Sequence, residues 1–192
     1  AHGHEAHHDC EHHDHHEHAT GQDPHIWLSL KNMRKIIGDL TVFLTELDPE
    51  NGAFYAENAQ KLLTECDTLD AEFQATTATL KNRQLVVSHR AFGYLCQDYG
   101  LEQVALEGYS AYSDPSPAQM VKIVEFIREN QVPVIFVDLS ETRKGADAIA
   151  RETGVKIAVL HPMGTLTEEQ LKAGADYFSV MRENLEALKA LR

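Results

Sequence analysis

The chain has 192 residues, which is enough for one full domain or for one lobe with a long appended helix. Apolar residues make up 43% and charged residues 24%, the ordinary composition of a folded globular protein. The formal net charge of −13 argues against nucleic acid or an anionic membrane surface as a partner, because both attract clustered Lys and Arg.

Histidine is concentrated at the start of the chain, where it alternates with acidic residues. Nine of the 12 histidines lie there: His2, His4, His7, His8, His12, His13, His15, His16 and His18. This stretch has no apolar period to bury, so residues 1–22 are expected to form a disordered loop. Alternating imidazoles and carboxylates suit Zn²⁺, Cu²⁺ and Ni²⁺, which predicts a weak multi-site metal loop. An expression tag is the alternative interpretation.

Residues 23–82 are expected to be helical. Ser29 can cap a first helix that ends near Leu47, and after a break the apolar residues from Phe54 to Leu80 follow one helical stripe. The second helix would be about 40 Å long at about 1.5 Å per residue. A helix of this length must lie across a whole lobe or join two lobes.

Short apolar runs alternate with helical patterns over residues 83–192. The expected strands lie at 85–87, 103–106, 132–137 and 155–160. The expected helices lie at 91–99, 116–130, 146–153 and 168–191. Strands separated by helices indicate parallel βαβ units. The predicted fold class is therefore α/β, with a parallel, doubly wound sheet.

The three histidines outside the first segment each fall at the end of a predicted element. His89 follows the first strand, His161 follows the fourth strand, and His25 precedes the cap of the first helix. In open α/β sheets the ligand crevice lies outside the carboxyl ends of the strands. Shared metal binding is therefore favoured over three separate capping roles. Imidazoles without clustered thiolates select Zn²⁺ over Ca²⁺, Mg²⁺ and Fe–S clusters.

The fourth zinc ligand stays open at this point. Zinc prefers four ligands, and water, a carboxylate or a residue upstream of the chain would complete the set. Asp138 follows the third strand and Glu107 follows the second, and each is a candidate ligand of the metal or a candidate outer contact of the site. Carboxylates at strand ends cap helices at least as often. Cys66 and Cys96 fall on apolar helical stripes, which predicts buried thiols.

Four short motifs occur together and in order. They are Asp-Pro-His-Ile-Trp at 23–27, Ser-His-Arg-Ala-Phe-Gly-Tyr at 88–94, Asp-Pro-Ser-Pro at 114–117 and Ala-Ile-Ala-Arg-Glu-Thr-Gly at 148–154. They resemble the zinc/manganese solute-binding proteins of bacterial ABC transporters. The resemblance implies two α/β lobes joined by a rigid long helix, with the metal between them and residues 83–192 as the C-terminal lobe. It also implies that His25 and His89 are ligands, and that the histidine-rich loop marks a zinc-specific member.

Two features depart from the family pattern. The family's usual carboxylate in its D-P-L/M-G motif is replaced by His161 in His161-Pro162-Met163-Gly164, which tilts the expected site toward zinc. The N-terminal lobe, which would supply a further histidine, is expected to be absent from this chain. The chain is then a fragment that holds the linking helix and the C-terminal lobe.

By resemblance, the expected function is high-affinity binding of Zn²⁺ outside the cytoplasm, in the periplasm or at the cell surface. The protein would act as a monomer and deliver the ion to the membrane permease of an ABC transporter, without making or breaking a covalent bond. One alternative is a three-histidine zinc hydrolase or lyase, which lacks an obvious general base in the sequence. The other is a metal buffer that binds only through its histidine-rich segment.

Overall fold

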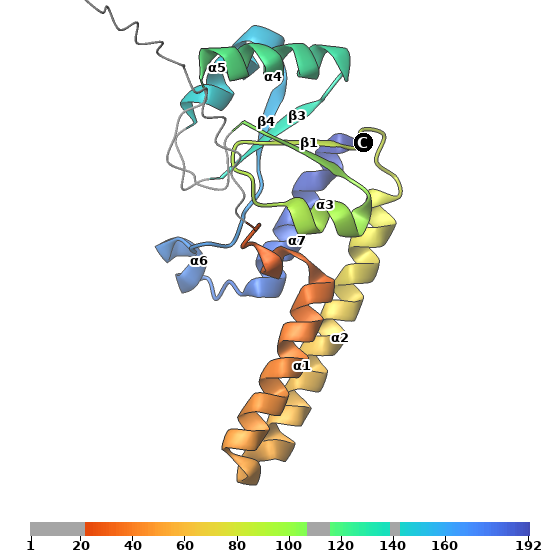
Figure 1. Ribbon diagram of the computed structural model, residues 1–192, viewed down its shortest axis with the longest axis vertical. Coiled ribbons are helices and arrows are strands. Elements are labelled where there is room, and N and C mark those ends of the chain that lie inside the picture. The colour runs from red at the N-terminus through yellow and green to blue at the C-terminus, as the bar shows by residue number, and fades with distance from the viewer. Residues whose placement is uncertain (1–21, 107–115, 139–142) are drawn as a thin grey trace, which may run out of the picture.

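The computed structural model describes residues 22–106, 116–138 and 143–192. These residues form an α/β lobe from which a long helical hairpin projects (Figure 1). The histidine-rich residues 2–18 and Glu107 lie outside the described residues. Within the described part, no helix is both long and apolar enough to span a lipid bilayer.

Two antiparallel helices make the hairpin. A 3₁₀ turn, η1 (Ile26–Leu28), leads into α1 (Leu30–Leu47), and a second 3₁₀ turn, η2 (Pro49–Asn51), leads into α2 (Gly52–Thr77). Ser29 caps α1 as predicted, because its hydroxyl oxygen accepts the Asn32 backbone N–H at 3.1 Å. The 26 residues of α2 extend about 39 Å at about 1.5 Å per residue.

The lobe is built on four parallel strands in the order β2-β1-β3-β4. They are β1 (Gln84–Val87), β2 (Glu102–Ala105), β3 (Val134–Val137) and β4 (Lys156–Val159). The helices are α3 (Gly93–Tyr99), α4 (Pro117–Glu129), α5 (Lys144–Thr153), α6 (Glu168–Lys172) and α7 (Tyr177–Leu188). The predicted α/β fold with a parallel, doubly wound sheet is confirmed.

Each face of the sheet carries its own hydrophobic core, because successive side chains of a strand point to opposite faces. Leu85 and Val87 of β1 share one core with residues of α2, α3 and α7, whereas Val86 shares the other core with residues of α4 and α5. Figure 1 shows these two groups of helices on opposite sides of the sheet. Helices on both faces of the sheet leave the carboxyl edge of the strands free for loops. This edge is where β1, β3 and β4 lead into Ser88, Asp138 and Leu160.

The sequence pattern predicts one final helix from 168 to 191, and this prediction is wrong. Instead α6 ends at Lys172, Gly174 adopts a left-handed backbone with φ +74, and α7 starts afresh at Tyr177. Asp176 caps α7, since its carboxylate accepts the Ser179 backbone N–H at 2.8 Å. A residue with positive φ cannot continue a right-handed helix, so the apolar period of the two helices is interrupted here.

Candidate metal centre

His25 and His89 meet at the carboxyl edge of the sheet. Their Nε2 atoms are 3.2 Å apart, and the two rings are nearly perpendicular, with centroids separated by 5.0 Å. The residues are 8% exposed each, so both imidazoles are largely withdrawn from solvent. His89 is brought here by the end of β1, and His25 by the turn η1 at the root of the hairpin.

The separation of the two nitrogens matches the spacing of two zinc ligands. In a tetrahedral site with Zn–N bonds of about 2.0 Å, two ligand nitrogens lie about 3.3 Å from each other. The Nε2 atoms of His25 and His89 are within about 0.1 Å of that spacing. A zinc ion can therefore bridge the pair with little movement of either backbone.

Asp23 orients the His25 ring. Its Oδ1 atom lies 2.8 Å from His25 Nδ1 and also accepts the His25 backbone N–H at 3.0 Å. An ionised carboxylate can only accept, so Nδ1 carries the ring proton and the lone pair of a neutral ring is on Nε2, facing His89. A carboxylate behind a ligand histidine is the common outer contact of zinc sites.

The position of Asp23 depends on the glycine at the start of α3. A Cβ atom built on Gly93 would lie 2.7 Å from Asp23 Oδ2, closer than carbon and oxygen can pack. Any side chain at position 93 would therefore push the carboxylate away from His25. Asp23 was not among the residues predicted to be functional, although its place two residues before the candidate ligand His25 was a usable signal.

A further contact holds the root of the hairpin against the lobe. The Ser29 hydroxyl donates to Asp98 Oδ2 at 2.5 Å, and Lys31 Nζ lies 2.9 Å from Asp98 Oδ1. Asp98 belongs to α3, whereas Ser29 is the cap of α1, so these contacts join the segment carrying His25 to the α/β lobe. The contacts restrict movement of His25 relative to His89.

His161 is also buried and lies at the end of β4, but its ring is engaged locally. The Met163 backbone N–H donates to His161 Nδ1 at 2.8 Å. A neutral His161 ring that accepts at Nδ1 carries its proton on Nε2, so ligation through Nε2 requires this bond to be given up. Among the described residues, no group of three or more His, Cys, Asp and Glu side chains is close enough to hold one ion. The structure thus brings together His25 and His89 without the third histidine.

Of the two carboxylates suggested by the sequence, only Asp138 lies in the described part of the chain. Asp138 is buried and directly follows β3, the strand that pairs with β1. It is therefore at the same edge of the sheet as His89. Contact of Asp138 or Glu107 with the metal stays a prediction.

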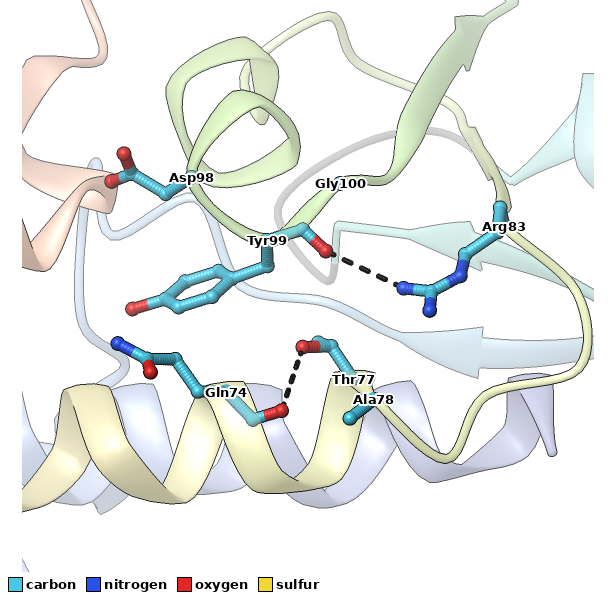
Figure 2. A pocket seen from close by; sticks show the side chains of 7 residues that line it. All are labelled: Gln74, Thr77, Ala78, Arg83, Asp98, Tyr99 and Gly100. Atoms are coloured by element: carbon cyan, nitrogen blue, oxygen red, sulfur yellow. Dashed lines mark hydrogen bonds between the residues drawn. The ribbon is translucent and has the colours of Figure 1, made fainter.

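A polar hollow of about 640 Å³ lies away from the histidines, between the end of α2 and the end of α3. Figure 2 shows Arg83 at one side, with its guanidinium directed toward the Tyr99 carbonyl, to which it donates at 3.4 Å. Asp98 also borders the hollow, but its carboxylate is occupied by Ser29 and Lys31. The residues lining this hollow include no histidine or cysteine.

A parallel α/β lobe with a long helical hairpin, and with buried histidines at the strand ends, is the architecture of a metal solute-binding protein. The chain belongs to the family described as the periplasmic component A of the zinc-uptake complex, ZnuA, which matches residues 1–191. The family resemblance of the sequence motifs is therefore confirmed.

Relatives and a solved structure agree with this assignment. The zinc-binding lipoprotein AdcA of Streptococcus pneumoniae is 36% identical over 179 residues, covering 92% of this chain and 36% of that protein. The high-affinity zinc uptake system protein ZnuA of Bacillus subtilis is 34% identical over 167 residues, covering 87% of this chain and 52% of that protein. The Zn(II)-bound ZnuA-like domain of S. pneumoniae AdcA has a TM-score of 0.77 at 35% identity, covering 88% of this chain and 63% of that domain. The chain thus spans between about a third and about a half of these curated relatives.

Proposed function

We propose that this chain is part of a protein that captures Zn²⁺ outside the cytoplasm, in the periplasm or at the cell surface, and delivers it to the permease of an ABC transporter. The observation that carries the proposal is the 3.2 Å approach of the Nε2 atoms of His25 and His89, with Asp23 holding one ring in the tautomer that a metal needs. Its relatives named as zinc-binding and zinc-uptake proteins support zinc as the ion.

In this proposal His25 and His89 are the first two ligands, and His161 is the third. His161 joins when the ion displaces the Met163 N–H from the ring, so its contribution comes with a local rearrangement of the loop after β4. Asp138 or Glu107 is proposed as a further ligand or as an outer contact. The histidine-rich residues 1–22 are proposed to collect zinc weakly and to raise its local concentration.

The proposed activity is reversible binding by a monomer, and not hydrolysis. Asp23 contacts His25 directly, and its Oδ1 already accepts two hydrogen bonds from this residue. A carboxylate held in this way orients a ligand and is poorly placed to remove a proton from a metal-bound water. This arrangement supports the transport proposal over the hydrolase alternative.

The experiment that tests the function uses the single tryptophan as a local probe. The ring of Trp27 packs edge-on against His25 with centroids 5.3 Å apart, so its fluorescence should change when His25 binds a metal. Chelator-buffered Zn²⁺ sets the free concentration whatever the histidine-rich segment binds. We expect a saturable change at low free Zn²⁺ in the wild type and its loss in His89→Ala, which leaves Trp27 and His25 in place. Unchanged tight binding in His89→Ala would contradict the proposal.

A further inference from the structure

Helix α7 contacts two of the three segments that carry the proposed ligand histidines, those of His25 and His161. At its first residue, the Tyr177 hydroxyl donates to the Trp27 carbonyl at 2.8 Å. Trp27 in turn donates from Nε1 to the Pro162 carbonyl at 2.9 Å and packs against the His25 ring. Trp27 therefore joins the turn after His25 to the loop after His161.

The second contact of α7 is made by Asn184 with the backbone of His161. Asn184 is 1% exposed, and its carboxamide accepts the His161 N–H at 2.7 Å and donates to the His161 carbonyl at 2.8 Å. The side chain thus pairs with both backbone groups of one residue, as a neighbouring strand would. This pairing fixes the direction in which the chain leaves β4.

Tyr177 and Asn184 lie on one face of a rigid helix. They are seven positions apart, which is about two turns and about 10 Å along the axis. Between them, Val180 and Met181 are fully buried, and Met181 belongs to the core that α7 shares with the sheet. The distance between the two contacts is therefore set by helix geometry and by core packing.

We propose that Tyr177 and Asn184 are positioning residues of the zinc site, and that α7 sets the spacing between the segment of His25 and the loop of His161. The inference rests on the proposed zinc-binding function and extends it to two residues that do not touch the metal. A site whose ligands are held before the ion arrives loses less conformational freedom on binding. Loosening one contact should therefore weaken zinc more than it weakens the fold.

Tyr177→Phe removes only the hydroxyl, and Tyr55→Phe is a matched control. Tyr55 is half-buried like Tyr177 and donates a hydrogen bond of the same 2.8 Å length to Asp48, near the far end of the hairpin. The full chain of each variant is titrated with chelator-buffered Zn²⁺ while Trp27 fluorescence is recorded, and its unfolding in urea is measured. The anisotropy of Trp27 in the zinc-free proteins gives a signal that a loss of stability elsewhere would not change.

We expect Tyr177→Phe to bind zinc about 3- to 10-fold more weakly than the wild type, the range for one neutral hydrogen bond. Its Trp27 anisotropy should fall, while Tyr55→Phe keeps wild-type affinity and anisotropy at a similar cost in urea stability. Wild-type zinc affinity in Tyr177→Phe, or an equal loss in both variants, would overturn the positioning role and leave the zinc function intact. A wild type without a zinc-dependent Trp27 signal would overturn the proposed function, and this inference with it.

Discussion

The Nε2 atoms of His25 and His89 lie 3.2 Å apart although 64 positions separate the residues in the sequence. Because Asp23 holds the proton of His25 on Nδ1, the two Nε2 atoms can share only the proton of His89 in the zinc-free protein. In the proposed site the His89 proton would move from Nε2 to Nδ1, so that both Nε2 atoms offer a lone pair to zinc. The two rings would therefore be joined by a hydrogen bond in the zinc-free protein and by the ion in the proposed zinc-bound protein.

The carboxylate behind His25 should matter for metal affinity. Asp23→Asn keeps an oxygen that can accept from Nδ1 but removes the negative charge that strengthens His25 as a ligand. We expect about 10-fold weaker zinc binding, at the lower end of the range for outer contacts of metal sites. Asp39→Asn is the control, since it removes the same charge from an exposed residue of α1 that pairs with Lys35. Competition with a zinc chelator measures both, and equal losses would show a general effect of charge.

The close approach of Gly93 to Asp23 predicts a selective effect of a single methyl group. In Gly93→Ala the new Cβ would fall 2.7 Å from Asp23 Oδ2, so the carboxylate must turn away from His25. Zinc affinity should fall several-fold in the chelator competition. Gly38→Ala is the control, because a Cβ there meets nothing within 4 Å and should stabilise α1 by about 0.5–1 kcal/mol. Wild-type zinc affinity in Gly93→Ala would show that Asp23 can move without loosening the site.

His161 is expected to tune the choice of metal. His161→Asp places an anionic oxygen where the family resemblance expects one, and it can still accept the Met163 N–H. The harder ion Mn²⁺ should gain affinity relative to Zn²⁺, whereas His161→Ala should weaken Zn²⁺ outright. Competitive Zn²⁺/Mn²⁺ titration measures the ratio. A ratio that is the same in the wild type and both variants would remove His161 from the ligands and leave it as part of the turn at Met163.

Buried thiol and phenol groups predict loss of stability in alkali. Burial raises the pKa of the Cys96 thiol from 9.0 to about 12, and burial also raises the pKa values of Cys66, Tyr99 and Tyr177. Between pH 9 and pH 12 the unfolded chain has released the Cys96 proton while the folded chain still holds it. The stabilisation is therefore complete below pH 9 and is lost as the pH rises toward 12.

Urea unfolding at several pH values between about 7.5 and about 10.5 measures this effect, because the thiol of the unfolded chain titrates within this range. Cys96→Ala should be less stable at neutral pH, since it leaves a small cavity, but its stability should fall less steeply with pH. Equal slopes for the wild type and the variant would show that Cys96 ionises without opening the core.

Much of the fold follows from local patterns in the sequence. The apolar runs of β1 and β3 and the helical period of α1 are properties of neighbouring residues, so the parallel α/β lobe and the two helices before it could be predicted, whereas their pairing as a hairpin was not. The break between α6 and α7 was missed because the apolar period resumes after Gly174, and the period alone does not show that this glycine has a left-handed backbone.

By itself, the sequence determined which histidines lie at the ends of elements, since a strand's end is a local feature. Only the tertiary structure decided which of them meet. His25 reaches His89 because the hairpin root is held against α3 through Ser29 and Asp98, a contact between segments about 70 positions apart. The roles of Tyr177 and Asn184 depend on which face of α7 packs against the sheet. Such distances result from the packing of whole elements, and no local pattern of residues encodes them.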